Sequence, residues 1–226
     1  MRTILLSSSN RGKVAEITAI LGPALQAIDA ELKLPADVGI LDWDVEETGA
    51  TFAENAVLKA RALADRSGLV AVADDSGLCV DALGGEPGVR SARWLGASAT
   101  DIDRNTALLD RLRTVGLQDR TAQFVCVAAI AWPAGSEHVE MGTLEGVIAL
   151  EPAGRNGFGY DPIFCPTVSV DGTGDRGGNA HGTLVSQKTL AELSADQKNR
   201  ISHRRNAFEK LAKIFSQIAV GEAHNI

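Results

Sequence analysis

Residues 51–77, TFAENAVLKARALADRSGLVAVADDSG, contain the pattern that decides the fold class. Thr51 and Glu54 match the capping box, in which each side chain accepts a hydrogen bond from the other residue's backbone N–H. The box predicts a helix, and Gly68 is expected to end it. The apolar run Leu69–Ala73 then indicates a buried strand. A helix followed at once by a buried strand is typical of an α/β protein.

The flanking sequence extends this alternation in both directions. Thr3–Ser7 indicates another buried strand. The spacing of Val14, Ile17 and Leu21 predicts a helix. This helix is expected to stop at the pair Gly22-Pro23. Further elements are expected as a helix at about Thr100–Val115, strands at Thr121–Trp132 and Gly142–Leu150, and a helix at His203–Ile218. We therefore predict an α/β fold with a mixed sheet, and one domain over residues 1–226, since no break in composition marks a second.

Composition excludes several classes of function. The 226 residues are 45% apolar and 23% charged, with a formal net charge of −7. An acidic chain is not expected to bind a nucleic-acid polymer through its backbone. The longest apolar run, Phe124–Trp132, is far shorter than the roughly 20 residues of a membrane span. Ile4–Leu6 is too short for a signal peptide, so we expect a cytoplasmic protein. Its three cysteines lack metal-site or disulfide spacing and are expected to be reduced.

The charge is unevenly distributed along the chain. Residues 37–54 contain six acids and no base, whereas residues 198–213 contain six bases and one acid. Two solvated surfaces would account for this pattern. A site that holds a metal cation at one side and an anion at the other would also account for it.

The acidic pair Asp74-Asp75 follows the predicted strand, where α/β proteins commonly bind ligands. Carboxylate oxygens are the ligands that Mg²⁺ takes, and a carboxylate can also accept a proton from an attacking water. A turn without any chemistry is the alternative. Glu46-Glu47 precede the capped helix and are candidates for a second ligand, although the helix dipole alone favours acids there.

Two cationic segments are candidates for phosphate binding. Residues 8–13, Ser-Ser-Asn-Arg-Gly-Lys, lie between a strand and a helix, where backbone amides and the helix dipole favour anions. A simple helix cap would give the same pattern. Asn55 and Lys59 lie four residues apart on one face of the capped helix, so Lys59 is a second candidate, with a solvated lysine as the alternative.

Two further segments are candidates for binding a base. Residues 156–162, Asn-Gly-Phe-Gly-Tyr-Asp-Pro, place two aromatic residues in a glycine-containing bend, where a ring can stack on a nucleobase. A hydrophobic turn that closes the sheet end is the alternative. Ser202 is the expected cap of the last helix, and His203 to Arg205 oppose its dipole, which indicates an electron-rich group opposite them.

Two other motifs fail in their context. Residues 172–177 match GxGxxG, but no strand leads closely into them and no helical pattern follows. Ser76 lacks the GxSxG turn of a serine hydrolase. His181 has no neighbour at metal-ligand spacing.

Taken in order, the motifs resemble the inosine triphosphate pyrophosphatase family. The matching stretches are Ser8–Lys13, Glu46–Lys59, Ala73–Leu78, Gly84–Arg93, Gly157–Phe164 and Ser202–Arg204. The resemblance implies a two-lobed α/β protein with an elongated mixed sheet flanked by helices, a substrate cleft between the lobes, and a homodimer. The sequence departs from the family's pattern at Cys165–Gln187, a segment that is longer and richer in glycine than in typical members. Within it, the Gly-, Asp-, Thr- and Asn-rich composition of Val170–Gly182 predicts a mobile loop.

The resemblance also implies roles for single residues. Glu47 and Asp75 would hold Mg²⁺, and Asp75 would be the catalytic proton acceptor, assisted by Asp74. The residues expected to bind substrate are Ser8, Ser9, Asn10, Arg11, Gly12, Lys13, Lys59, Ser76, Phe158, Gly159, Tyr160, Asp161, Lys198, His203 and Arg204.

The implied activity is hydrolysis of non-standard (non-canonical) purine nucleoside triphosphates (ITP, dITP and XTP) to the monophosphate and pyrophosphate. Donors at Lys198, His203 and Arg204 suit the O6 acceptor of a 6-oxo purine, whereas adenine presents a donor at that position. Two other functions stay open: a nucleotide-binding regulator without turnover, and a pyrophosphatase acting on modified pyrimidine nucleotides.

Overall fold

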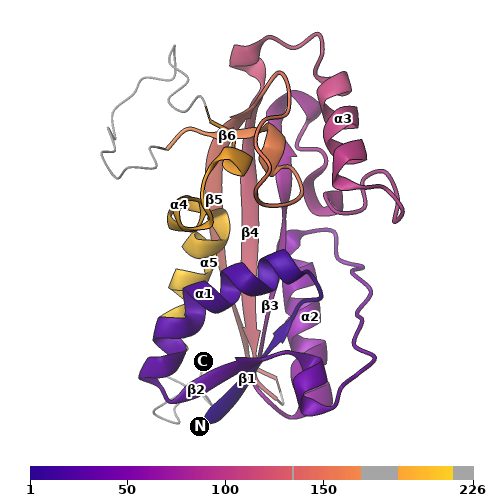
Figure 1. Ribbon diagram of the computed structural model, residues 1–226. Coiled ribbons are helices and arrows are strands. Elements are labelled where there is room, and N and C mark those ends of the chain that lie inside the picture. Colours follow the sequence, from indigo (N-terminus) through magenta and orange to yellow (C-terminus); the bar gives the residue numbers. More distant parts are fainter. Residues whose placement is uncertain (134, 169–187, 216–226) are drawn as a thin grey trace. The chain divides into compact units, whose positions relative to one another are not determined.

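The computed structural model describes residues 1–133, 135–168 and 188–215. Figure 1 shows its elements along the chain. The strands are β1 (Arg2–Ser7), β2 (Ala30–Lys33), β3 (Ala71–Val80), β4 (Thr121–Ala131), β5 (Glu137–Ile148) and β6 (Phe164–Pro166). The helices are α1 (Arg11–Ala27), α2 (Phe52–Ser67), α3 (Asp101–Arg111), α4 (Ala195–Ile201) and α5 (His203–Ala212).

The six strands form one mixed sheet in the order β2-β1-β3-β4-β5-β6. β1 pairs in parallel with β2 and with β3, whereas β5 and β6 are antiparallel. The predicted α/β fold with a mixed sheet is confirmed. The chain divides into two compact units. Unit 1 comprises Met1–Ser76, Cys126–Gly142 and Arg204–Ile226, and unit 2 comprises Gly77–Val125 and Thr143–His203.

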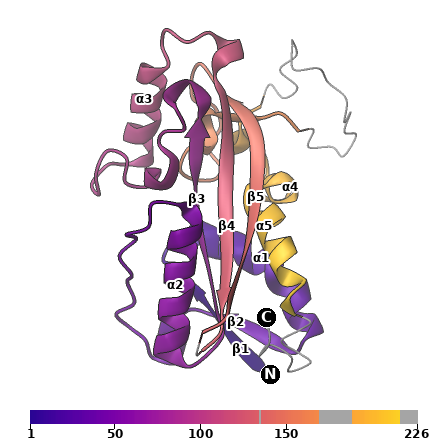
Figure 2. The same ribbon diagram turned by 180° about the vertical axis from the view of Figure 1, so that it is seen from behind.

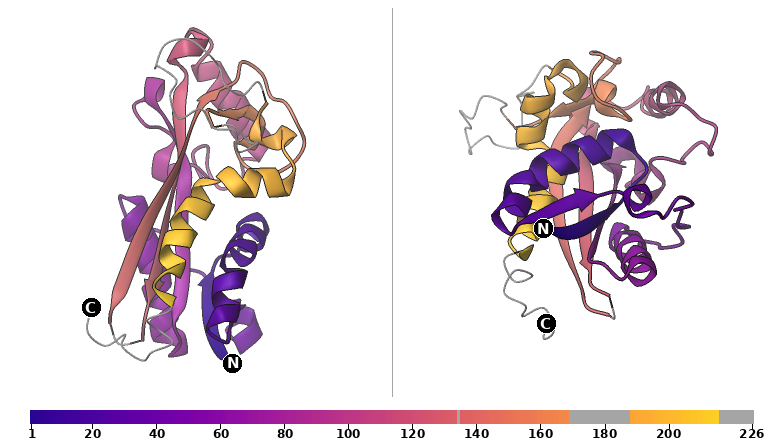
Figure 3. Two further views of the ribbon diagram at one scale, coloured as in Figure 1. Left: turned by 90° about the vertical axis from the view of Figure 1, so that its left-hand side faces the viewer. Right: turned by 60° about the horizontal axis from the view of Figure 1, so that its bottom comes forward.

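Unit 1 is a sheet with a hydrophobic core on each face. Along β3, Val72 packs into the core that contains α1 and α5, whereas Ala71 and Ala73 pack into the core that contains α2. Figures 1 and 2 view these two faces, and the left view of Figure 3 shows α1 and α5 together on one side. Because both faces are buried, Ile4–Leu6 of β1 and Cys126–Ala131 of β4 are continuous apolar runs that do not alternate.

Unit 2 has one core of its own. Leu108 and Leu112, on and just after α3, pack with Leu78 and Val80 of β3 and with Phe164 of β6. Arg120, which is only 3% exposed, donates to the backbone carbonyls of Leu112, Val115 and Ala149. Leu112 is the C-cap of α3, and Val115 lies in the turn that follows it. The core therefore fixes α3 against the sheet strands of this unit.

The predicted end of the second strand is wrong. β3 continues through residues 74–77 to Val80, so the acidic pair lies inside a strand. The register explains the error: Ser7, the last residue of β1, pairs with Ala73. Asp74 and Asp75 thus lie just beyond the end of the neighbouring strand β1. β3 continues past them because it also neighbours β4 and because Leu78 and Val80 are buried in the unit 2 core.

Other boundaries differ for similar reasons. α1 continues through Pro23 to Ala27, because burial of Leu21 and Leu25 outweighs the hydrogen bond that a proline removes. β5 begins at Glu137 rather than Gly142, since its first residues are exposed or half-exposed and form no apolar run. α3 ends at Arg111, earlier than predicted, and the last helix is described over His203–Ala212.

The remaining expectations on composition have mixed outcomes. Among the described residues, no helix is long and apolar enough to cross a membrane. All three cysteines are free, as expected. Phe208, Leu211 and Phe215 are buried as the helical spacing predicts, whereas Ile218 lies outside the described residues. So do His181, the 172–177 motif and the segment Val170–Gly182.

Candidate active site

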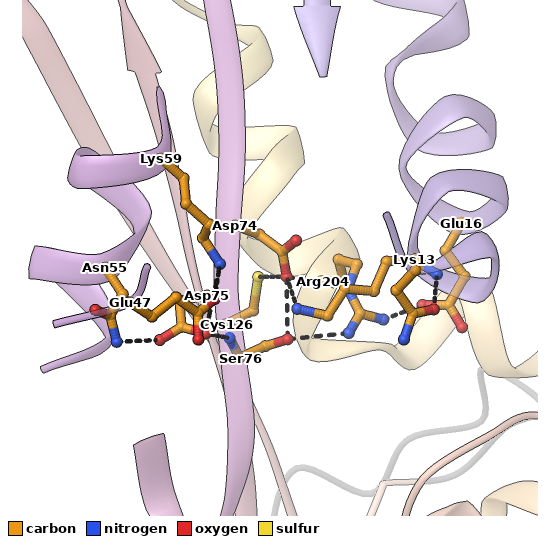
Figure 4. Close-up of polar contacts among 11 residues, drawn as sticks. Lys13, Glu16, Glu47, Asn55, Lys59, Asp74, Asp75, Ser76, Cys126 and Arg204 are labelled. Atoms are coloured by element: carbon orange, nitrogen blue, oxygen red, sulfur yellow. Dashed lines mark hydrogen bonds and ion pairs between the residues drawn. The ribbon is translucent and has the colours of Figure 1, made fainter. Parts of the chain in front are cut away.

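The two carboxylates of the acidic pair point to opposite faces of β3. Side chains alternate along a strand, so Asp74 lies on the face covered by α1 and α5, and Asp75 lies on the face covered by α2. Figure 4 shows both carboxylates with their partners, all from unit 1. Both side chains are buried, at 1% and 5% exposure. Buried carboxylates require specific partners, and each has a different set.

Asp74 is surrounded by cations. Its Oδ2 lies 3.0 Å from Lys13 Nζ and 3.6 Å from Arg204 Nε, and it accepts a hydrogen bond from Ser76 Oγ at 3.0 Å. Burial alone would raise the pKa of Asp74, but Lys13, Arg204 and Lys59 together hold it well below its usual range. Asp74 is therefore a permanent negative charge at neutral pH.

Arg204 connects three elements of unit 1. Its Nη2 donates to Ser76 Oγ at 3.1 Å, and its Nη1 pairs with the carboxylate of Glu16 on α1. Burial would lower its pKa, but Asp74 and Glu16 raise it further above its ordinary value. Glu16 was missed by the sequence analysis. Its spacing of one helical turn from Lys13 was the available signal.

Asp75 has a different environment. Its Oδ2 accepts from Asn55 Nδ2 at 3.0 Å and its Oδ1 accepts from the Ser76 backbone N–H at 3.0 Å. Burial raises the pKa of Asp75, and this outweighs the nearby Lys59 at 3.8 Å and the Asn55 hydrogen bond. A carboxylate with a raised pKa is a stronger base than an ordinary aspartate.

Glu47 and Asp75 both face Lys59. Lys59 Nζ lies 2.5 Å from Glu47 Oε1 and 3.8 Å from Asp75 Oδ1. Burial would lower the pKa of Lys59, but Asp74, Asp75 and Glu47 raise it. The segment that carries Glu47 is held to α2, because the Gly49 backbone N–H donates to Asn55 Oδ1 at 2.8 Å. The predicted shared face of Asn55 and Lys59 thus organises both carboxylates.

The carboxylates of Glu47 and Asp75 fit a hard divalent cation. Both present oxygen atoms to a single positive charge, and carboxylate oxygen is the ligand that Mg²⁺ prefers. Among the described residues no cluster of three or more His, Cys, Asp or Glu side chains could hold a metal. Two carboxylates are nevertheless sufficient for Mg²⁺, which completes its shell with water and substrate phosphate.

The segment Ser8–Lys13 comprises the connection from β1 to α1 and the first residues of α1. Asn10 caps the helix, with its Oδ1 accepting from the Lys13 backbone N–H at 3.1 Å. The first turn of α1 contains Arg11 and Lys13 and no acid, although the helix dipole favours acids there. Ser9, Asn10 and Arg11 are exposed, so this cap leaves donors accessible to an anion.

Unit 2 brings together the aromatic bend and one of the predicted cations. Lys198 Nζ lies 2.6 Å from Asp161 Oδ2 and 4.6 Å from the centre of the Phe158 ring. Asp161 Oδ2 also accepts from the Phe158 backbone N–H at 2.9 Å. Lys198 is on α4, a helix that the sequence analysis missed although Ser194 and Gln197 form a capping box.

Two more predicted residues are buried in unit 2. The His203 ring stacks on Phe124 with 4.8 Å between ring centres. Tyr160 donates its hydroxyl to the Ser91 carbonyl oxygen at 2.9 Å, and burial raises the pKa of Tyr160 to about 12. Tyr160 is thus anchored as a neutral phenol, and Phe158 is the more exposed ring of the bend.

A family model matches most of this chain. The model is that of the Ham1 family, and it matches residues 4–214. This range includes every residue of the candidate site described above.

Curated relatives and solved structures agree with that match. A dITP/XTP pyrophosphatase of Streptomyces avermitilis is 44% identical over 96% of this chain and 99% of its own length. A dITP/XTP pyrophosphatase of Bacillus subtilis is 40% identical over 95% of this chain and 97% of its own length. The structure of the Staphylococcus aureus Ham1 protein has a TM-score of 0.77 at 39% identity and covers 96% of this chain and 100% of that chain. A Mycobacterium abscessus structure described as nucleoside-triphosphatase / dITP/XTP pyrophosphatase has a TM-score of 0.68 at 41% identity, covering 94% and 98%. With its fold and nearly its whole length matched, this chain belongs to the Ham1 family.

Proposed function

We propose that this protein hydrolyses ITP, dITP and XTP to the nucleoside monophosphate and pyrophosphate. Water is added across the α–β phosphoanhydride bond, so pyrophosphate leaves and the nucleoside keeps one phosphate. The substrate class is supported by the relatives, which are named dITP/XTP pyrophosphatases. The observation that carries the chemistry is the buried pair Asp74–Asp75, in which Asp74 is held by Lys13 and Arg204 and Asp75 is oriented by Asn55 and the Ser76 backbone.

Asp75 is the proposed proton acceptor for the attacking water. Asn55 and the Ser76 backbone each occupy one of its oxygens, which fixes the orientation of the carboxylate. A carboxylate oriented to accept the proton of an attacking water contributes about 10²–10⁴-fold to a hydrolysis rate. Asp74 assists indirectly by holding Lys13 and Ser76.

The triphosphate is proposed to bind at the N-terminus of α1. Ser8, Ser9 and Asn10 supply side-chain polar groups, and Arg11, Gly12 and Lys13 supply cations and backbone amides. Lys59 and Ser76 are proposed to contact the phosphates from α2 and β3. Donors fixed before the reaction stabilise charge that develops on phosphate oxygen.

Mg²⁺ is the proposed cofactor, with Glu47 and Asp75 as its protein ligands. Bound Mg²⁺ would supply charge neutralisation at the phosphate oxygens. Lys59 lies between these two carboxylates, so we expect its ammonium group to move toward phosphate when the cation is present.

Phe158–Asp161 and Lys198 are proposed to bind the purine base, together with His203 and Arg204. Phe158 presents a ring for stacking on the base. The cationic donors suit the O6 acceptor of hypoxanthine and xanthine, and a buried donor left unpaired by adenine disfavours ATP.

A substrate panel tests this proposal. Purified protein with Mg²⁺ is incubated with ITP, dITP, XTP, GTP, ATP and modified pyrimidine triphosphates, and monophosphate, pyrophosphate and orthophosphate are measured. We expect monophosphate and pyrophosphate from ITP, dITP and XTP, and no turnover when EDTA replaces Mg²⁺. Orthophosphate with nucleoside diphosphate would contradict the bond assignment.

The same panel separates the two other functions. Tight binding of a triphosphate without any product would indicate a regulator. Turnover confined to pyrimidine nucleotides would indicate the other class of pyrophosphatase. A homodimer in the cytoplasm is also proposed, and sedimentation equilibrium of the purified protein tests the oligomeric state.

A further inference from the structure

Helix α3 of unit 2 holds both polar groups of one peptide residue in the aromatic bend. The Gly159 backbone N–H donates to Asp101 Oδ2 at 2.7 Å, and the Gly159 carbonyl oxygen accepts from Asn105 Nδ2 at 3.1 Å. Asp101 and Asn105 are four residues apart, so they lie on one face of α3. Two hydrogen bonds at one residue fix the orientation of both adjoining peptide groups.

Gly159 depends on these bonds, because it has no side chain that could pack against its surroundings. Its φ is +63°, a left-handed conformation that is only one of the many backbone conformations open to glycine. A Cβ built at Gly159 would meet no atom of the described residues within 4 Å. Without Asp101 and Asn105, the turn hydrogen bond from the Asp161 N–H to the Phe158 carbonyl oxygen at 3.3 Å would still span this residue, but neither polar group of Gly159 itself would be held.

The neighbouring residues of the bend have their own restraints. Tyr160 donates to the Ser91 carbonyl oxygen at 2.9 Å, and Asp161 is paired with Lys198 at 2.6 Å. Phe158 directly precedes Gly159, so the direction of its ring depends on the peptide that joins them. The α3 hydrogen bonds thus complete the fixation of the segment Phe158–Asp161.

Burial of the Asn105 side chain costs folding free energy, and this cost supports a positioning role. It is only 5% exposed, and within the described part of the chain its Oδ1 has no hydrogen-bond partner. A buried unpaired acceptor destabilises the folded state, whereas leucine at the same position would not have this penalty. Donation to the Gly159 carbonyl is the contact that an apolar residue could not replace.

We propose that Asp101 and Asn105 are positioning residues that set nucleotide affinity by fixing the segment Phe158–Asp161. This inference rests on the proposed function of that segment in base binding. Neither residue is placed near the reacting bond, and both act through Gly159. Loss of a positioning contact for the nucleoside is expected to change KM far more than kcat.

Kinetics of matched variants test the proposal. Asp101→Ala and Asn105→Ala are each expected to raise KM for dITP at least fivefold, with kcat changed less than twofold. Asp101→Asn is expected to stay within twofold of the unmodified protein, because an amide oxygen still accepts from the Gly159 N–H. Asp103→Ala is the control, since it removes an acid from the same helix turn and breaks the capping box with Thr100 without contacting the bend.

Hydrogen exchange gives a readout that does not need activity. We expect the Gly159 amide to exchange at least tenfold faster in Asp101→Ala, and at an unchanged rate in Asp101→Asn and Asp103→Ala. Equal KM values for Asp101→Ala and Asp103→Ala, or unchanged Gly159 exchange in Asp101→Ala, would overturn the positioning role. Absence of hydrolysis by the unmodified protein would defeat the proposed function instead, so the two failures are distinguishable.

Discussion

Replacing Asp74 with asparagine removes one negative charge from the buried centre of unit 1 while preserving the shape of the side chain. The carboxylate is 1% exposed and is contacted by Lys13 and Arg204. Arg204 is itself only 3% exposed. The Asp74→Asn variant would therefore leave two partly or fully buried cations with less compensating charge.

The distances give the size of the expected effect. At an effective dielectric constant of 20, ion pairs at 3.0 Å and 3.6 Å are each worth about 5 kcal/mol before desolvation is subtracted. Burial of the carboxylate offsets much of that sum. Removing one partner of a buried pair destabilises proteins by about 3–5 kcal/mol. We expect the lower end, about 3 kcal/mol, since Glu16 still pairs with Arg204.

Urea-induced unfolding measures this loss, with Asp65→Asn as the matched control. Asp65 is exposed on α2, and its substitution is expected to change the free energy of unfolding by about 0.5 kcal/mol or less. A double-mutant cycle of Asp74→Asn with Lys13→Met is expected to give a coupling of about 1–3 kcal/mol. A loss below about 1 kcal/mol in Asp74→Asn, or a cycle without coupling, would refute the reasoning.

Three other predictions concern single residues. Asp75→Asn is expected to lower dITP turnover by about 10²–10⁴-fold without lowering the urea midpoint, because burial disfavours the ionised carboxylate, and an active variant would exclude Asp75 as the base. Gly157→Ala is expected to lose about 1–3 kcal/mol in urea unfolding, because φ is +77° and the added Cβ would overlap Asp161 Oδ2; an unchanged midpoint would contradict this. Tyr160, the sole tyrosine, is expected to ionise at about pH 12 in the native protein and near its ordinary value of about 10 in urea, by phenolate absorbance. Its contribution to stability is complete below that ordinary value and is lost as the pH rises toward 12; a native midpoint near 10 would disprove the anchoring.

The sequence predicts elements best where local chemistry and burial agree. The Thr51–Glu54 capping box and Gly68, in the left-handed region at φ +68°, delimit α2 as expected. β1, the start of β3 and the unit 1 part of β4 are recognisable because both of their faces are covered, whereas β2, whose four residues are all half-buried, was not predicted. Three residues that contact the acidic pair, Lys13, Asn55 and Lys59, were also identifiable, since each belongs to a motif that the sequence analysis selected as a candidate for the site.

Tertiary contacts account for what the sequence does not predict. Glu16, Asp101 and Asn105 are ordinary polar residues on helices, and their roles depend on which strand or loop each helix covers. The continuation of α1 past Pro23 likewise depends on burial of Leu25, which is a property of the assembled core. Local preferences are weak compared with such packing.

The length of β3 explains how two adjacent aspartates come to differ. Had the strand ended at Ala73, both carboxylates would lie in a turn, exposed to similar surroundings. Because β3 continues, the two-residue period sends Asp74 toward Lys13 and Arg204, and Asp75 toward Asn55 and Lys59. One pKa is thereby lowered and the other raised. Neighbouring carboxylates with separated pKa values can divide a fixed charge from a proton acceptor, and the proposed hydrolysis would use the pair in this way.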